Sequence, residues 1–217
     1  MKITIGGQQM IAYLPLDIPK INFDLDMVEQ QPFQPHHIWP DGWRCLPILG
    51  KTDKWDQESF YEAWTGRFEP GEVKTNPNVS KFLVDQIMSL VDQFPIEPNH
   101  VQILNQKDYI TPHKDAPEIT TVAKTQKEPA GFKIILNEEL ERSFFVQKEE
   151  DGKRHFITLP NDTNCFTINE HEVFHGSKPP TKPKYVVSCF GIIDDEKHDT
   201  LINKSMDKYG DEYGIFF

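Results

Sequence analysis

The sequence predicts a mainly β protein whose strands form a barrel or sandwich, the class that includes jelly rolls and cupins, with one or more supporting helices toward the N-terminus. From about residue 100, the chain is a series of short apolar, β-branched and aromatic segments, separated by turn residues such as Asp-Gly at 151–152. Many short strands at near-regular spacing are typical of these folds. The 217 residues, of which 37% are apolar, suit a single domain over residues 1–217.

Each expected element depends on a local pattern. The expected strands are residues 43–49, 101–104, 132–136, 143–146, 155–159, 165–168 and 185–193. In residues 79–94, apolar side chains recur at the spacing of one face of an α-helix, and Pro95 blocks its continuation. Asn78 or Ser80 can cap its start.

These elements divide the domain into three parts. We expect a β and loop extension over residues 1–78, and a core of one helix and the β-strands over residues 79–193. Residues 194–217 are highly charged and end in apolar residues. We expect them to form a tail that docks those residues on the barrel, while a lid or a dimer contact is the alternative.

Composition excludes several kinds of partner. A net charge of −11 and an isoelectric point of about 5.2 argue against nucleic acid or an anionic membrane surface, since both call for basic patches. Cys45, Cys165 and Cys189 show no close pairing, which indicates a reducing compartment and excludes a Cys-rich zinc site. No apolar run approaches the roughly 20 residues that span a bilayer, and the first residues lack the apolar core of a signal peptide. We therefore expect a cytoplasmic protein.

The residues that carry chemistry begin in segment 109–115, Tyr-Ile-Thr-Pro-His-Lys-Asp. His113 and Asp115 are two residues apart, so on an extended strand their side chains point to the same face. An imidazole beside a carboxylate supplies two ligands of the facial triad that binds Fe(II) in non-haem oxygenases, and His175 can supply the third. Such a triad leaves three octahedral positions for a bidentate co-substrate and O2. An isolated His-x-Asp pair also occurs in ordinary surface turns, so the pair gains weight from its surroundings.

A second feature lies on the strand that begins at Lys184. Lys184 and Ser188 share one face of this strand, because they are four residues apart. A cation and a hydroxyl on a cavity wall could hold the distal carboxylate of 2-oxoglutarate. The alternative is a solvated lysine at a sheet edge.

Together these segments resemble the Fe(II)/2-oxoglutarate-dependent oxygenase superfamily, and within it the aspartyl/asparaginyl β-hydroxylase-like group. The resemblance lies in Pro-His-Lys-Asp at 112–115, Phe-Lys-Ile-Ile-Leu-Asn at 132–137 and His-Gly-Ser at 175–177, followed by a basic residue and an apolar strand. Trp-Arg-Cys-Leu-Pro at 43–47 and the helix after it are similar to the upstream layout of that group. The resemblance covers residues 79–193 well and residues 1–78 loosely.

The resemblance implies a double-stranded β-helix and a hydroxylase that acts on a peptide, protein or small-molecule substrate and releases succinate and CO2. Its cofactor would be Fe(II), its co-substrates 2-oxoglutarate and O2, and its reductant ascorbate. By the same resemblance, His113, Asp115 and His175 are the iron ligands and the catalytic centre.

The resemblance also assigns the co-substrate site. Lys184 takes the place of the usual arginine, beside Ser188, and loses the bidentate fork of a guanidinium group. Lys133 is the rival anchor, because it lies on the strand that lines the same pocket in relatives. Tyr109 and Asn105 are candidates for further hydrogen bonds. The N-terminal region and loop 116–130 are expected to cover the pocket.

Residues 171–175, His-Glu-Val-Phe-His, match a zinc metalloprotease signature. That motif works only on a helix, and the β-like residues before it and Gly176 and Pro179 after it argue against one. A zinc metalloprotease and a non-enzymatic cupin-like module that binds a metal or ligand are therefore the alternatives. The remaining histidines lack ligand spacing and are expected at the surface or around the site: His36, His37, His100, His155 and His198.

Overall fold

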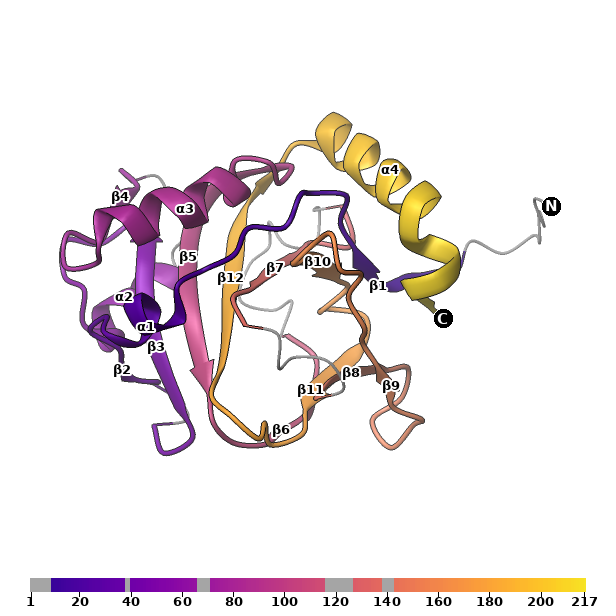
Figure 1. The fold of residues 1–217 in the computed structure, drawn as a ribbon, viewed down its shortest axis with the longest axis horizontal. Helices are drawn as coiled ribbons and strands as arrows, with labels where there is room; N and C mark the ends of the chain where they lie inside the picture. The colour runs from indigo at the N-terminus through magenta and orange to yellow at the C-terminus, as the bar shows by residue number, and fades with distance from the viewer. Residues whose placement is uncertain (1–8, 38–39, 66–70, 116–126, 138–142) are drawn as a thin grey trace.

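The structure is a computed structural model that describes residues 9–37, 40–65, 71–115, 127–137 and 143–217 (Figure 1). The helices are α1 (Leu25–Glu29), α2 (Gln57–Thr65), α3 (Lys81–Val91) and α4 (Asp195–Tyr213). The strands are β1 (Ile11–Pro15), β2 (Gln34–Pro35), β3 (Trp43–Gly50), β4 (Lys74–Thr75), β5 (Ile96–Gln106), β6 (Ile110–His113), β7 (Gly131–Ile135), β8 (Phe144–Gln147), β9 (His155–Phe156), β10 (Cys165–Ile168), β11 (Phe174–Ser177), β12 (Lys184–Ile193) and β13 (Ile215–Phe216). The prediction of a mainly β protein is confirmed.

The strands form two antiparallel sheets. The larger sheet has the order β13-β1-β10-β7-β12-β5-β3-β2, with β4 paired to β3, and the smaller sheet has the order β6-β11-β8-β9. From β5 to β12 the chain passes back and forth between them: β5, β7, β10 and β12 belong to the larger sheet, and β6, β8, β9 and β11 to the smaller one. In the view of Figure 1, β8, β9 and β11 of the smaller sheet lie below β7 and β10 of the larger one. One cavity is lined by residues of both sheets.

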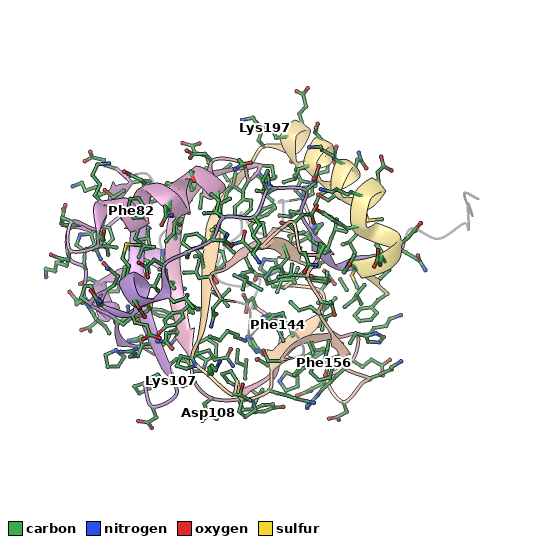
Figure 2. All side chains as sticks on the ribbon, viewed as in Figure 1. Phe82, Lys107, Asp108, Phe144, Phe156 and Lys197 are labelled. Carbon is green, nitrogen blue, oxygen red and sulfur yellow. The ribbon has the colours of Figure 1, made fainter. Side chains whose placement is uncertain are left out.

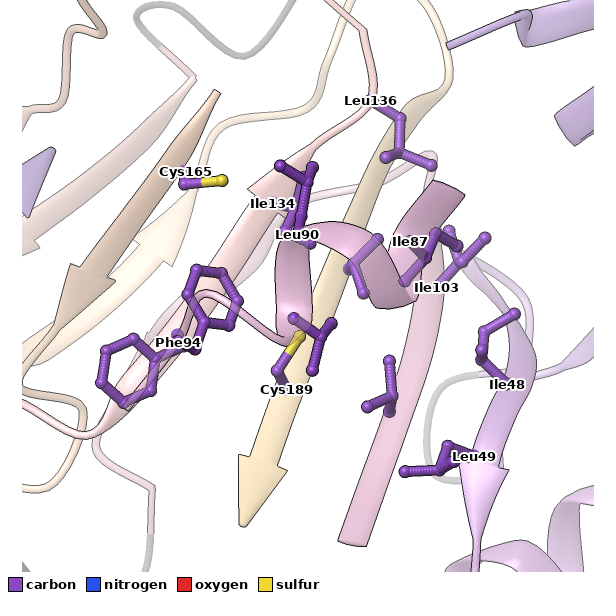
Figure 3. Close-up of a cluster of buried hydrophobic side chains, with 14 of the residues drawn as sticks. Ile48, Leu49, Ile87, Leu90, Phe94, Ile103, Ile134, Leu136, Cys165 and Cys189 are labelled. Carbon is purple, nitrogen blue, oxygen red and sulfur yellow. The ribbon is translucent and has the colours of Figure 1, made fainter. Parts of the chain in front are cut away.

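Helix α3 covers the face of the larger sheet that points away from this cavity. Leu83, Ile87 and Leu90 are fully buried, at the spacing of one helical face. Ile87 and Leu90 are labelled in Figure 3, where they point into the cluster. They belong to one cluster with alternate residues of β3, β5, β7 and β12, including Leu46, Ile48, Val101, Ile103, Ile134, Val187 and Cys189. Helix α3 is shorter than the predicted helix over residues 79–94, because Ser80 is its N-cap and the chain turns after Asp92. The apolar pattern runs further because residues 79 and 94 are buried in the same core.

A second apolar cluster fills the space between the sheets at the end away from β5. It joins Tyr13 of β1 and Phe166 of β10 to Val146 of β8, and the rings of Tyr13 and Phe166 lie 5.6 Å apart. This packing fixes the separation of the sheets on one side and leaves the cavity on the other.

The C-terminal segment differs from the predicted tail, because residues 195–213 form the long helix α4. Asp194 caps its N-terminus, and His198, Ile202 and Tyr209 are buried against the body of the protein. The buried face includes histidine, serine and glycine, so it lacks the apolar periodicity that revealed α3. Strand β13 follows and pairs with β1, so the apolar end does dock on the sheet as expected.

In the described residues of the N-terminal part, helices α1 and α2 accompany the strands, in line with the expected supporting helices. Helices α1 and α2 are short, and their sequences show no strong apolar period. The three cysteines are free and buried, Cys45 on β3, Cys165 on β10 and Cys189 on β12. In the described part of the chain, no helix combines the length and apolarity needed to cross a membrane.

Candidate metal centre and its cavity

The three predicted metal ligands meet at the edge of the smaller sheet. Strands β6 and β11 pair so that His175 lies opposite His113, with ring centroids 4.4 Å apart. Oδ1 of Asp115 lies 3.5 Å from Nε2 of His113 and 3.6 Å from Nε2 of His175. One ligand atom from each residue lies within 4.8 Å of the others. Within the described ranges, no other group of three histidine, cysteine or acidic residues has this arrangement.

Both histidines can present Nε2 as a ligand atom. Nδ1 of His113 lies 2.8 Å from the carbonyl oxygen of Thr111, and donating to it leaves the Nε2 lone pair free to bind a metal. Burial, together with the neighbouring His113, lowers the pKa of His175 to about 3. His175 is therefore neutral at pH 7, which is the protonation state that binds metals.

Asp115 lies beyond the end of β6, which stops at His113, so strand pairing does not hold it. The turn at residues 170–172 holds it instead. Its amide donates to the carbonyl of Glu170 at 2.9 Å, and its own carbonyl lies 3.1 Å from Nδ1 of His171. The turn that supplies both partners leads directly into β11 and His175. The position of one ligand is thus tied to that of another.

The His-Glu-Val-Phe-His segment is not helical, as predicted. Residues 171–173 form a turn and bend, and residues 174–175 begin β11. His171 lies outside the triad, and Glu172 is exposed. This arrangement does not present the two histidines and the glutamate to one metal, as a zinc metalloprotease requires.

The triad borders a cavity of about 400 Å³ between the sheets. Strand β12 contributes every second residue, beginning with Lys184 and continuing through Ser188 to Phe190. The paired strand β5 contributes the matching even-numbered residues, and Phe144 of β8, labelled in Figure 2, contributes from the smaller sheet. The structure therefore brings Lys184 and Ser188 into the same cavity as the triad.

The side chain of Lys184 is buried, with a relative exposure of 1%. Its Nζ donates to Oγ of Ser177 at 2.9 Å and lies 5.5 Å from the ring centroid of Phe144. No carboxylate of the described residues forms an ion pair with it. Burial lowers its pKa to about 7, because desolvation penalises the ammonium form.

Lys133 also lines the cavity, but it already has a carboxylate partner. Its Nζ lies 2.8 Å from Oε2 of Glu170 and 4.8 Å from the ring centroid of Phe190. Burial alone would lower the pKa of Lys133, but the carboxylates of Glu170 and Asp115 outweigh burial and raise it. Gly131 makes room for this pair, because a Cβ there would lie 2.7 Å from Cδ of Glu170.

The structure does not bring Tyr109 or Asn105 into the cavity. Tyr109 is 37% exposed, and its hydroxyl accepts a hydrogen bond from Arg154 at 3.0 Å. Asn105 is fully buried on β5, but strand alternation turns it to the opposite face from Leu104 and Gln106, which line the cavity. Neither is therefore placed to contact a co-substrate beside the triad.

A further wall of the cavity comes from the N-terminal part, as expected, but through residues that the sequence did not mark. Helix α2 contributes Phe60, whose ring stacks on His100 with centroids 4.1 Å apart. It also contributes Tyr61, which stacks on His37 at 4.6 Å. The sequence offered only the aromatic richness of this region as a signal. Of loop 116–130, residues 116–126 lie outside the described residues.

Comparison with known proteins assigns no family: no protein-family model matches the chain, and no curated protein matches it.

Proposed function

We propose that this protein is an Fe(II)- and 2-oxoglutarate-dependent dioxygenase that hydroxylates a peptidyl or small-molecule substrate. One observation carries the proposal. A His-Asp-His triad and a buried lysine without a carboxylate partner among the described residues face the same cavity. A metal and an anion are what these two features are suited to bind.

The strand order supports the fold that this function implies. The chain alternates between β5-β12-β7-β10 in one sheet and β6-β11-β8-β9 in the other. Two four-stranded antiparallel sheets built by such alternation are the arrangement of a jelly roll, and we propose that this core is a double-stranded β-helix. The remaining strands extend the larger sheet on both sides.

The donor set fits Fe(II). His113 and His175 offer imidazole nitrogens, and Asp115 offers one carboxylate oxygen, all from the side of the smaller sheet. When bound, the iron would supply the oxidative chemistry, in which 2-oxoglutarate and O2 yield succinate, CO2 and a hydroxyl group on the substrate. The protein residues would hold the reactants in place and keep bulk water away from them.

In this proposal Lys184 holds the distal carboxylate of 2-oxoglutarate. An anion there would provide the counter-charge that the described residues do not, and would keep the ammonium protonated. Lys133 is the weaker candidate because Glu170 already neutralises it. Lys184 and Ser188 are four residues apart on β12, about 13 Å at about 3.3 Å per residue, so Ser188 lines the cavity further along the strand than the proposed anchor.

The substrate side of the cavity indicates an uncharged group. The wall formed by the N-terminal part and β5 carries rings, amides and Leu104, with Phe60, Tyr61 and Gln102 among them. Burial and the neighbouring His37 lower the pKa of His36 to about 4, so His36 is neutral at pH 7. We therefore propose that the group hydroxylated carries no charge.

Release of succinate from 2-oxoglutarate by purified protein with Fe(II) and ascorbate tests the proposal. His113→Ala should abolish this turnover, and His155→Ala is the matched control, because His155 lies at the far end of the smaller sheet against Phe217. Glu172→Gln should be tolerated, whereas a zinc metalloprotease would lose its activity. Lack of any wild-type turnover, coupled or uncoupled, across a broad substrate panel would favour a non-enzymatic binding module.

A further inference from the structure

His171 lies between Asp115 and Glu128. Its Nδ1 lies 3.1 Å from the main-chain carbonyl oxygen of Asp115. Its Nε2 lies 3.9 Å from Oε1 of Glu128. The imidazole side chain is 18% exposed, so water competes little for these contacts.

We propose that His171 is a positioning residue that fixes the metal-binding carboxylate of Asp115 by holding its main-chain carbonyl. This inference rests on the metal centre of the proposed function and adds a residue that acts through a ligand without binding the metal. It also gives a role to the first histidine of the His-Glu-Val-Phe-His segment.

Asp115 needs such support because the sheet stops before it. The β6–β11 pairing holds His113 opposite His175, but Asp115 lies two residues beyond β6. Within the described residues, the main chain of Asp115 makes two contacts: its amide donates to Glu170, and its carbonyl lies beside Nδ1 of His171. The first contact holds the peptide unit before Cα of Asp115, and the second holds the unit after it. Loss of the second contact lets the main chain rotate about the N–Cα bond of Asp115, which moves the carboxylate relative to both imidazoles.

The other side of His171 is also supported. The Glu128 carboxylate accepts a hydrogen bond from the amide of Ala130 at 2.9 Å, which fixes it close to Nε2 of His171. Helix α4 holds the same stretch, because Nε2 of His198 lies 3.0 Å from the carbonyl oxygen of Pro129. The carboxyl group of Glu128 thus occupies the space beside Nε2, on the side of the ring away from Asp115.

Metal binding by two variants tests the inference. His171→Leu removes the donor, and His171→Asn keeps an amide N–H near the position of Nδ1. With Co(II) as the probe, His171→Leu should weaken affinity about 10- to 100-fold, the usual cost of losing a group that orients a ligand. His171→Asn should recover most of that loss. Glu172→Gln is the matched control, since it alters the neighbouring, exposed residue.

Hydrogen exchange of the Asp115 amide in metal-free protein provides a readout that needs no metal. Exchange should be faster in His171→Leu than in wild type and in Glu172→Gln, while amides in the middle of β5 and β12 keep their protection, which shows that the fold is intact. Unchanged Co(II) affinity and unchanged Asp115 exchange in His171→Leu would overturn the inference and leave the proposed function standing. Absence of Co(II) binding by wild type would count against the proposed function, while the exchange comparison would still decide the role of His171.

Discussion

Replacement of Lys184 by methionine should stabilise the empty protein and weaken the binding of 2-oxoglutarate. Methionine has a similar length and needs no hydrogen bond, and Oγ of Ser177 keeps a partner because it donates to the carbonyl of Lys178 at 2.9 Å. The variant therefore removes a buried charge without leaving an unsatisfied group behind.

The stability change follows from the pKa of Lys184, which is about 7 in the folded protein and 10.5 for an ordinary lysine. This difference corresponds to about 5 kcal/mol, at about 1.4 kcal/mol for each pH unit. The unfolded chain holds the proton up to the higher value, so the full penalty applies below pH 7 and disappears as the pH rises toward 10.5. Replacing buried charges by apolar residues has raised stability by about 1–4 kcal/mol elsewhere, which is the gain expected here at pH 6.

The binding change has the opposite sign. A hydrogen bond to a charged group contributes about 1.5–3 kcal/mol, so its loss should weaken 2-oxoglutarate binding about 10- to 150-fold. Because about half of the lysine is neutral in the free protein at pH 7, anion binding should also take up protons, and more of them at pH 8 than at pH 6.

Urea unfolding at pH 6 and pH 8 measures the change in stability. The change in binding is measured by calorimetric titration of the Mn(II)-loaded protein with 2-oxoglutarate. Titrations in buffers of different ionisation enthalpy give the number of protons taken up. Lys197→Met is the matched control, because that side chain on α4 is 74% exposed (Figure 2). The reasoning is refuted if Lys184→Met destabilises the empty protein at pH 6 or binds 2-oxoglutarate as tightly as wild type.

Three further outcomes are expected. Gly131→Ala should lower the free energy of unfolding in urea by about 1–3 kcal/mol, because its Cβ would lie 2.7 Å from Cδ of Glu170 and 2.9 Å from the carbonyl oxygen of Ile168. Gly71→Ala is the control, since its Cβ would meet only the flexible stem of a lysine. Equal losses of stability in the two variants would contradict this reasoning. Leu90→Ala should lower the free energy of unfolding by about 2–5 kcal/mol, because Leu90 is fully buried. Phe82 lies on the same helix and is 60% exposed, so Phe82→Ala should change this free energy by no more than about 0.5 kcal/mol. Urea unfolding midpoints measure both effects. A metal ion at 100 times its dissociation constant should stabilise the wild-type protein by about 2.7 kcal/mol and raise its Tm by about 5–10 °C. In thermal scans, the Tm of His175→Ala should not respond to the metal.

The sequence predicted an element correctly where its apolar residues repeat at the spacing of a helix or a strand. Helix α3 has an apolar face that repeats every three or four residues, so its pattern identified it. Helix α4 buries His198, Ser205 and Gly210 on its inner face, and no apolar pattern marks it. Strand β5 was predicted only over residues 101–104, because its first half is polar, yet it pairs with β12 from residue 96.

The candidate site divides in the same way. Strand alternation grouped Lys184 with Ser188, and both line the cavity. Asn105, which the resemblance suggested, lies one residue out of step with Leu104 and Gln106, so its side chain points to the other face of β5. The choice between Lys184 and Lys133 depended on Glu170, which lies 37 residues from Lys133 in the sequence and meets it only in the fold. His113 and Asp115 do converge, but a turn brings them together where the strand has already ended.

The buried cysteines have a practical consequence. Cys45, Cys165 and Cys189 stand on three different strands of the larger sheet, and burial raises the pKa of each thiol, to about 12 for Cys45. Thiols that are neutral and inaccessible react only when the chain around them opens. The alkylation rate of each cysteine thus reports how often the strand that carries it opens. Cys45 reports on β3 near one edge of the larger sheet, Cys189 on β12 at its centre, and Cys165 on β10 toward the other edge. The native chain therefore carries its own set of probes for conformational opening, which needs no engineered label.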